Sequence, residues 1–164
     1  LDRGGGYRDY IDIDSLINWW FVEELCLNEE SSRTKNCYLY KEVDGKIFVG
    51  PPWDFDAWTF GLSGRRKWYA KKTGLYYHQL FNDPYFVKRV KIKWKYYKPL
   101  WEVYIPLYID ELYSQIHRAA ERNEKKWTNW HRVNAYGVKS YSEIVDDMKT
   151  AFLDQLEWMD LEIN

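Results

Sequence analysis

The sequence predicts a mainly α-helical fold with one small β-hairpin, an α+β architecture in a single domain. Four long stretches repeat apolar side chains every three or four residues, which is the spacing of a helix with one buried face. One short stretch instead alternates apolar and polar residues around an Asp-Gly pair, as hairpins do. With 164 residues, 20% of them aromatic, the chain is long and apolar enough for one packed core, so we expect residues 1–164 to form one domain.

The N-terminal part is expected to consist of a flexible entry segment followed by a buried helix. Residues 1–11 contain three consecutive glycines from Gly4, without the spacing of a phosphate-binding loop. The helix is predicted from Asp12 to near Asn28, with Asp12 or Asp14 as its N-cap. Its apolar positions at helical spacing are Ile13, Leu16, Ile17, Trp20, Phe21 and Leu25.

A polar loop and a hairpin are predicted next. The stretch "EESSRTK", residues 29–35, has no apolar side chain and is therefore predicted to be a surface loop. The hairpin lies in "NCYLYKEVDGKIFVG", with its turn at Asp44-Gly45, a pair that tolerates positive φ. The hairpin is followed directly by "GPPWDFDAW", residues 50–58, in which two acids lie among three large aromatic side chains.

The remainder is predicted to be a loop and three helices. Residues 59–74, rich in glycine and basic side chains, are expected to form an extended, partly mobile loop. A helix should begin at Asp83-Pro84, and a further helix should follow it. The last helix opens with Ser140 and Glu143 at capping-box spacing. The apolar positions of these helices are Phe86, Val90, Trp94, Tyr97 and Trp101, then Ile105, Ile109, Leu112, Ile116 and Ala120, then Ile144, Met148, Phe152, Leu156, Met159 and Ile163.

Composition excludes several classes of function. With 24 basic and 25 acidic residues, the chain has no net positive charge that would attract nucleic acid. The basic stretch 87–98 is interpreted as a solvated helix face. No apolar run is long enough to span a membrane. Cys26 and Cys37 are compatible with two free thiols or with one disulfide. The ten tryptophans indicate core packing, with glycan stacking as the alternative.

The order of polar residues around the hairpin suggests a metal site. Because a hairpin returns the chain to its starting end, the side chains that flank it should share one rim; these are Glu29, Glu30, Asn36, Asp54 and Asp56. Carboxylate and amide oxygens suit Mg²⁺, which would neutralise a transferring phosphoryl group. Protein kinases have the same order, with an Asn before two short strands and a metal-binding Asp after them. The alternative is that Asp54 and Asp56 are turn or capping acids.

Four segments resemble the C-terminal half of the spore-coat protein H (CotH) kinase-like family. They are "YIDIDSLINWWFVEELCLN", "NCYLYKEVDGKIFVGPPWDFDAWTFG", "LYYHQLFNDPYFVKRVKIKW" and "FLDQLEWMDLEIN". The resemblance implies the C-lobe of an atypical, secreted, cell-surface or spore-associated protein kinase that uses ATP and Mg²⁺ to phosphorylate Ser residues of a protein or peptide substrate. It implies that Asp54 is the metal-binding aspartate, Asp56 the second acid of that motif and Asn36 an assisting ligand.

The sequence departs from the family pattern at two points. Family members have an aspartate, the expected catalytic base, about five residues before the position of Asn36, where this chain has Ser31. A serine hydroxyl has no useful basicity near neutral pH, so Glu30 is the candidate replacement, and the alternative is that Glu29 and Glu30 form a solvated face. The second departure is the nucleotide-binding N-terminal lobe, which is expected upstream in the parent chain; without this partner lobe we expect the fragment to be inactive.

Two further interpretations remain open at the level of sequence. Arg65, Arg66 and Lys67 follow the acid pair, where kinases bind substrate, and would attract an acidic or phosphorylated peptide, although a plain surface loop has the same composition. The whole chain is also compatible with a non-catalytic binding or scaffold module that retains a kinase-like fold without its chemistry, and such a module could be associated with glycans.

Overall fold

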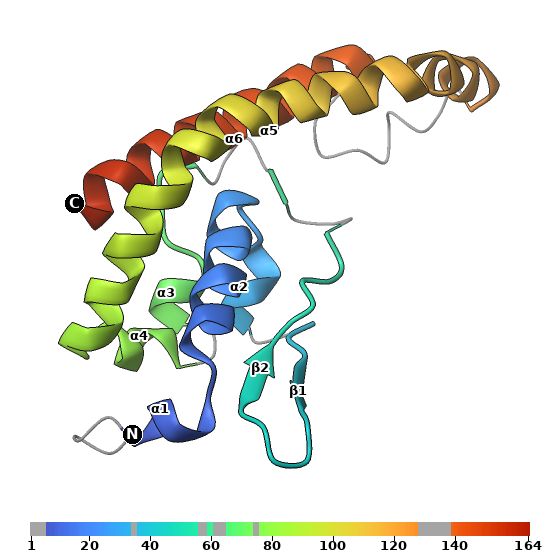
Figure 1. The fold of residues 1–164 in the computed structure, drawn as a ribbon. Coiled ribbons are helices and arrows are strands. Elements are labelled where there is room, and N and C mark those ends of the chain that lie inside the picture. Colours follow the sequence, from blue (N-terminus) through green and yellow to red (C-terminus); the bar gives the residue numbers. More distant parts are fainter. Residues whose placement is uncertain (1–5, 34–35, 56–58, 61–64, 74–75, 128–138) are drawn as a thin grey trace.

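The computed structural model describes residues 6–33, 36–55, 59–60, 65–73, 76–127 and 139–164 (Figure 1). It is mainly helical with one two-stranded antiparallel sheet, as the sequence predicts. The elements in chain order are α1 (Tyr7–Tyr10), α2 (Ile13–Leu25), the 3₁₀ helix η1 (Glu29–Arg33), β1 (Leu39–Lys41), β2 (Ile47–Val49), α3 (Ala70–Thr73), α4 (Tyr77–Leu80), α5 (Pro84–Lys126) and α6 (Tyr141–Ile163).

Helix α2 is the centre of the core. It begins where predicted, because the Asp12 carboxylate accepts a hydrogen bond from the Ser15 amide at 2.7 Å and caps the first turn. Nine of the 13 residues of the helix are buried and Asn18 is exposed, so most of its surface lies inside the protein. The Trp20 ring packs edge-on against Phe81 at 4.9 Å, and Phe21 packs against Trp94 at 5.5 Å. These contacts join α2 to the start of α5.

The hairpin forms at the predicted position and is attached to the start of α2. Strands β1 and β2 pair with Tyr40 opposite Phe48, and these two rings stack at 5.3 Å. The turn closes with the Gly45 amide donating to the Glu42 carbonyl at 3.1 Å, without the positive φ expected for Asp44-Gly45. The Val49 amide donates to the Ser15 hydroxyl at 3.1 Å, so the last residue of β2 is fixed to α2.

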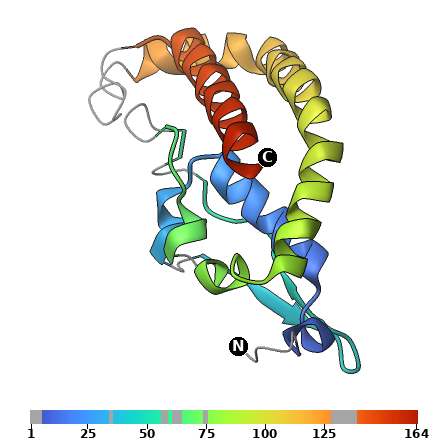
Figure 2. The same ribbon diagram turned by 90° about the vertical axis from the view of Figure 1, so that its left-hand side faces the viewer.

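Helix α5 is continuous, and the prediction of two separate helices is wrong. It runs for 43 residues and contains Pro99 and Pro106. A proline inside a helix removes one backbone hydrogen bond and clashes with the carbonyl four residues earlier, so it bends a helix that tertiary packing preserves. The change of direction of α5 is visible in both Figure 1 and Figure 2. Beyond it, α5 runs beside α6, and apolar side chains such as Leu107, 59% exposed, face solvent.

Helix α6 has the predicted capping box and closes the core from the other side. The Ser140 hydroxyl accepts from the Glu143 amide, and the Glu143 carboxylate accepts from the Ser140 amide. The indole N–H of Trp94 donates to Asp160 at 2.6 Å, which fixes α6 against α5. The buried residues of α6 are Val145, Ala151, Phe152, Gln155, Leu156, Met159 and Ile163. The predicted positions Ile144 and Met148 are only half-buried.

The described part of the predicted entry segment is held in place. Tyr7 donates to Asp83 at 2.6 Å, and the Arg8 guanidinium pairs with the same carboxylate at 2.6 Å. Burial and the neighbouring carboxylate raise the pKa of Tyr7 to about 12. Residues 7 and 8 are therefore attached to Asp83, which also caps α5 and lies far away in the sequence.

Residues 65–73 are also anchored, which corrects the expected extended, mobile loop for its described part. The Tyr69 and Lys71 amides donate to the buried Glu24 carboxylate at 2.7 and 2.8 Å. The Arg66 amide donates to the side chain of Gln155 at 2.8 Å, and Gln155 in turn donates to the Lys67 carbonyl at 3.0 Å. Two buried polar side chains from distant helices therefore satisfy the backbone of this segment.

Cys26 and Cys37 are both thiols in the structure and do not form a disulfide with each other. Burial raises the pKa of Cys26 to about 12 and of Cys37 to about 11, so neither is a reactive thiolate at neutral pH. Among the described helices, none is long and apolar enough to cross a membrane.

Candidate functional site

Polar side chains are buried where α2 ends. Of the six buried polar side chains among the described residues, four lie within this short stretch: Glu23, Glu24, Asn28 and Ser31. The helix ends with the Leu27 amide donating to the Glu24 carbonyl and the Asn28 amide donating to the Glu23 carbonyl. Leu27 has a φ of 53°, a left-handed conformation in which glycine is usual at a helix end. A leucine is present because this side chain is fully buried.

Asn28 connects the buried helix end to η1. Its side-chain amide donates to the Glu23 carboxylate at 2.7 Å and accepts from the Glu30 backbone amide at 3.0 Å. Its backbone carbonyl accepts from the Ser31 hydroxyl at 2.7 Å. Asn28 is only 3% exposed, so both polar groups of its side chain are satisfied inside the protein. It therefore fixes the position from which Glu30 projects.

The carboxylates of Glu23 and Glu24 have different hydrogen-bond partners. Burial raises the pKa of Glu23 to about 7, and the hydrogen bond from Asn28 opposes the increase. Burial also raises the pKa of Glu24 to about 7, although the Trp20 indole and the backbone amides of Tyr69 and Lys71 all favour the charged form. Glu24 is therefore a structural anchor for α3, while Glu23 supports Asn28.

Ser31 is buried and lies in a 3₁₀ helix, so the prediction of a surface loop at 29–35 is wrong at this residue. The segment forms η1, and Ser31 is 1% exposed. Its hydroxyl donates to the Asn28 carbonyl, and its burial keeps the hydroxyl oxygen away from a substrate. The residue at the position of the family's expected base is thus part of the scaffold.

Three predicted residues meet beside the hairpin; we call Glu30, Asn36 and Asp54 the acid corner. The Asn36 side-chain amide donates to the Asp54 carboxylate at 2.6 Å and to the Glu30 carboxylate at 2.9 Å. Asp54 is exposed, whereas Glu30 and Asn36 are half-buried. The hairpin brings Asn36, which precedes β1, beside Asp54, which follows β2.

The backbone at the acid corner adopts a sparsely populated conformation. Asn36 has a φ of 56° and Asp54 a φ of 67°, both in the left-handed region. Asn and Asp enter this region more readily than other side chains, and such outliers concentrate at functional sites. Gly50, with a φ of 129°, gives the chain the turn that leads from β2 to Asp54.

The aromatic residues around Asp54 are less buried than their composition suggested. Trp53 is 57% exposed and packs edge-on against Tyr38 with ring centroids 6.2 Å apart. Phe55 is half-buried. Asp56 and Trp58 lie outside the described residues.

The basic residues that follow the acid pair lie beside η1. Lys67 pairs with Glu29 at 3.6 Å, which brings residues 65–67 next to the acid corner. Arg65 pairs with Asp154 on α6 at 2.8 Å. Arg66 is exposed and has a φ of 61°. Of the three residues predicted to bind substrate, two are thus engaged with acids of this chain, and Arg66 points its charge to solvent.

The donor set of the acid corner fits Mg²⁺. It offers the oxygens of two carboxylates beside an exposed face, while Asn36 directs its amide nitrogen to both and would have to turn its side-chain amide to offer an oxygen. Mg²⁺ is usually bound by one or two carboxylates and keeps several waters and phosphate oxygens. Within the described ranges no three His, Cys, Asp or Glu side chains gather into a fuller metal cluster. A weakly held ion shared with a phosphate-bearing ligand suits this corner better than a dedicated structural metal.

The sequence analysis did not identify Glu23 and Asn28 as residues that support the site. The pair of acids within the apolar stretch "FVEELCLN" could have indicated them, because an acid on the buried side of a helix needs a partner inside the protein. The partner itself could not be read from the sequence, since it depends on the turn that ends α2.

A family model described as CotH kinase protein matches residues 4–159, nearly the whole chain. No curated protein matches the chain. Likewise, no solved structure matches it. The matched range includes every described element from α1 to most of α6, and it includes the acid corner.

Proposed function

This chain belongs to the CotH kinase family, and we propose that its acid corner is the metal-binding part of a phosphotransfer site. The observation that carries the proposal is the Asn36 amide, which holds the Asp54 and Glu30 carboxylates together across the base of the hairpin. The kinase-like character of the domain follows from the family; the substrate, the nucleotide and the metal are part of the proposal.

Asp54 is the principal Mg²⁺ ligand in this proposal, and Asn36 and Asp56 assist it. Asp54 is the most exposed residue of the acid corner, so a metal and the phosphates of ATP can reach it from solvent. Bound there, Mg²⁺ would supply charge neutralisation for the phosphates. The contribution of the chain itself is to hold two carboxylates and one amide in place before the ligand arrives, which is the positioning that phosphotransfer needs.

Glu30 is the candidate base that orients and deprotonates the acceptor hydroxyl. Its backbone is fixed by Asn28 and its carboxylate is fixed by Asn36, so it lies in the acid corner without any shift of η1. Its neighbour Glu29 instead pairs with Lys67. Glu29 therefore provides a matched control: Glu30→Gln should lower the rate of transfer at least a hundredfold, and Glu29→Gln should change it less than threefold.

The proposed acceptor is a Ser side chain of a protein or peptide. Arg66, exposed beside the acid corner, suits an acidic residue of such a peptide. By family likeness the protein is expected to act outside the cell, at a cell surface or in a spore coat, together with the nucleotide-binding lobe of its parent chain.

The proposal is tested by labelled ATP with the full-length protein. We compare wild type with Asp54→Ala, and we use Asp44→Ala at the exposed hairpin turn as a control that removes an acid from the same surface. Autophosphorylation and transfer to a Ser peptide should be lost in Asp54→Ala and retained in Asp44→Ala. Equal activity of wild type and Asp54→Ala would eliminate the assignment.

The second candidate is a non-catalytic binding or scaffold module, and buried Ser31 favours it. The position of the family's expected base is occupied by a side chain that is hydrogen-bonded within the scaffold. A full-length protein that binds ATP and Mg²⁺ through Asp54 but transfers no phosphate would support this candidate. Robust transfer that depends on Glu30 would exclude it. Such a module could use Trp127, which is 59% exposed, to stack on a sugar ring of a glycan.

A further inference from the structure

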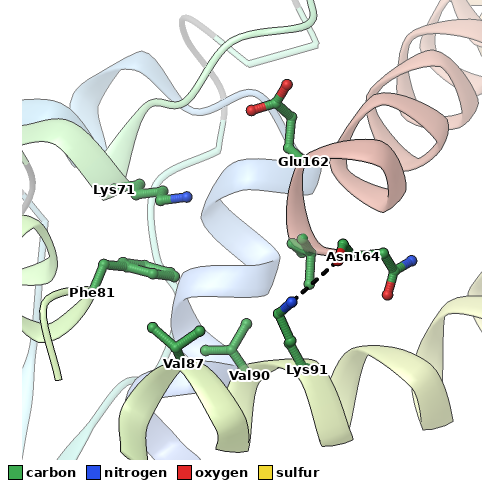
Figure 3. Close-up of a pocket in the computed structure, with 8 residues that line it drawn as sticks. Lys71, Phe81, Val87, Val90, Lys91, Glu162 and Asn164 are labelled. Carbon is green, nitrogen blue, oxygen red and sulfur yellow. Dashed lines mark hydrogen bonds between the residues drawn. The ribbon is translucent and has the colours of Figure 1, made fainter. Parts of the chain in front are cut away.

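Helix α5 carries a row of apolar side chains on the side that faces away from the core. In its first turns, Val87 and Val90 point toward Phe81 on the core side (Figure 3). The residues of the row follow one another in steps of four, four, three and four, and each is 39–66% exposed: Ile92, Tyr96, Leu100, Val103 and Leu107. Steps of three and four keep side chains on one face of a helix, so these residues form a continuous stripe about 22 Å long. We call it the α5 row.

The α5 row is larger than the scattered apolar residues of an ordinary protein surface. Single exposed apolar side chains are common, whereas a contiguous patch of several hundred Å² marks an interaction site. Tyr104 and Tyr108 lie beside the row and are exposed as well. With these two tyrosines the row offers on the order of 800 Å² per copy, which is the area that each partner buries in a protein interface of standard size. The area is therefore sufficient for a protein partner.

The two ends of the α5 row carry opposite charges. Lys88 lies four residues before Ile92, and Glu111 lies four residues after Leu107, so both continue the row. Both side chains are exposed. Among the described residues, neither forms an ion pair within its own chain. A surface with one charge at each end is complementary to an identical surface that runs in the opposite direction.

An antiparallel second copy would match the α5 row position by position. A two-fold axis between residues 99 and 100 would place positions at equal distances from the axis opposite each other. The pairs between copies would be Lys88 with Glu111, Ile92 with Leu107, and Tyr96 with Val103. Each pair occurs twice by symmetry, so two ion pairs would enclose an apolar centre. A two-fold contact requires a surface that is complementary to itself, and the row meets this requirement.

Neither the bend of α5 nor the charge of the chain opposes this pairing. A proline bends a helix away from its own side, because its ring clashes with the carbonyl four residues earlier. At 100° per residue, the α5 row lies roughly 60–80° around the helix from Pro99 and Pro106, so it runs along the flank of the bend. The formal net charge of the chain is −1, so two copies repel each other little.

We propose that the α5 row is a self-association surface, on which a second copy of this chain docks antiparallel through an apolar centre and two ion pairs between Lys88 and Glu111. No residue of the acid corner belongs to the row. The proposal therefore stands whether or not the chain takes part in phosphate transfer.

The test is sedimentation velocity of the full-length protein over a concentration series. Wild type should dimerise with a dissociation constant on the order of 10 µM, since an interface of this area without a deep anchor pocket falls at the weak end of the observed range. Val103→Glu places a charge at the apolar centre and should weaken dimerisation at least tenfold. Because Val103 is exposed, the thermal midpoint of this variant, measured at a concentration where wild type is monomeric, should equal that of wild type.

Exchange of the two charges tests the antiparallel register. Lys88→Glu would face Glu111 of the second copy, and Glu111→Lys would face Lys88, so each variant alone should dimerise at least tenfold more weakly than wild type. An equimolar mixture of these two variants restores both ion pairs in a heterodimer and should associate within threefold of wild type. Arg118→Glu is the control, because it reverses an exposed charge of α5 beyond the row; it should dimerise like wild type.

Four outcomes would overturn the proposal. Wild type could stay monomeric at 50-fold the expected dissociation constant. Val103→Glu could dimerise with wild-type affinity, which would assign the dimer to another surface. The mixture of Lys88→Glu and Glu111→Lys could associate no better than either variant alone, which would refute the register. Finally, a monomeric wild type that binds vesicles of anionic lipid, and loses this binding in Lys88→Glu, would assign the row to a membrane surface.

Discussion

Asn28 is expected to be the residue whose loss most damages both the fold and the acid corner. Asn28→Ala removes a buried side chain that makes two hydrogen bonds, one to the Glu23 carboxylate and one from the Glu30 amide. It leaves a buried carboxylate and a part-buried N–H group without these partners. Each unsatisfied group costs about 1–3 kcal/mol, so the free energy of unfolding should fall by about 2–6 kcal/mol.

A loss of that size is a large part of the stability of a domain, which is typically about 5–15 kcal/mol. The assay is urea denaturation followed by tryptophan fluorescence, with Asn18→Ala as the control. Asn18 lies on the same helix α2 and is exposed, so its replacement should change stability by less than about 0.5 kcal/mol.

Asn28→Ala should also weaken metal binding at the acid corner, because Asn28 positions the backbone of Glu30. We expect Mn²⁺, used as a spectroscopic substitute for Mg²⁺, to bind at least threefold more weakly to folded Asn28→Ala than to Asn18→Ala. If Asn28→Ala lost less than 1 kcal/mol and kept the Mn²⁺ affinity of the control, the connection between the buried helix end and the acid corner would be refuted.

Three further predictions follow from buried polar groups. Burial raises the pKa of Glu23 to about 7 from its ordinary 4.5, so between these pH values the folded state keeps a proton that the unfolded state has released. The free energy of unfolding should therefore fall by up to about 1.4 kcal/mol per pH unit for this group as pH rises from about 4.5 to 7. In urea titrations at pH 5, 6 and 7, Glu23→Gln should reduce this slope, and Glu24, whose pKa is also raised, should maintain the remaining pH dependence. Ser31→Asp should destabilise the fold by about 3 kcal/mol rather than restore a base, since a buried carboxylate would face the Asn28 carbonyl; a stable variant with increased phosphate transfer would contradict this. Gln155→Leu should cost about 2 kcal/mol and speed hydrogen exchange of the Arg66 amide more than tenfold, and unchanged exchange there would show that Gln155 does not hold the loop.

Much of the fold follows from local patterns in the sequence. The Asp12 cap, the Asp44-Gly45 turn region and the Ser140 to Glu143 capping box each act within four residues, so their partners can be read from spacing alone. The approach of Asn36 and Asp54 was predictable for a related reason, because a hairpin must bring its two flanks together.

The features that escaped prediction depend on partners far away in the chain. The segment 65–73 has a loop-like composition, and only the Glu24 and Gln155 side chains, from α2 and α6, give it a fixed conformation. Helix α5 contains Pro99 and Pro106, which normally end a helix, and it continues because α6 packs along it. Ser31 belongs to a polar heptapeptide, but the turn at Leu27 directs it inward.

The role of Asp54 is tested most directly by Mn²⁺ binding measured by electron paramagnetic resonance, with and without an ATP analogue that is not hydrolysed. Wild type and Asp44→Ala should bind one Mn²⁺ per chain with the same affinity, and Asp54→Ala should bind at least tenfold more weakly. Asn36→Ala should fall between them, because it removes the amide that holds the Glu30 and Asp54 carboxylates together. Identical Mn²⁺ binding by wild type and Asp54→Ala would contradict the assignment of the acid corner as a metal site.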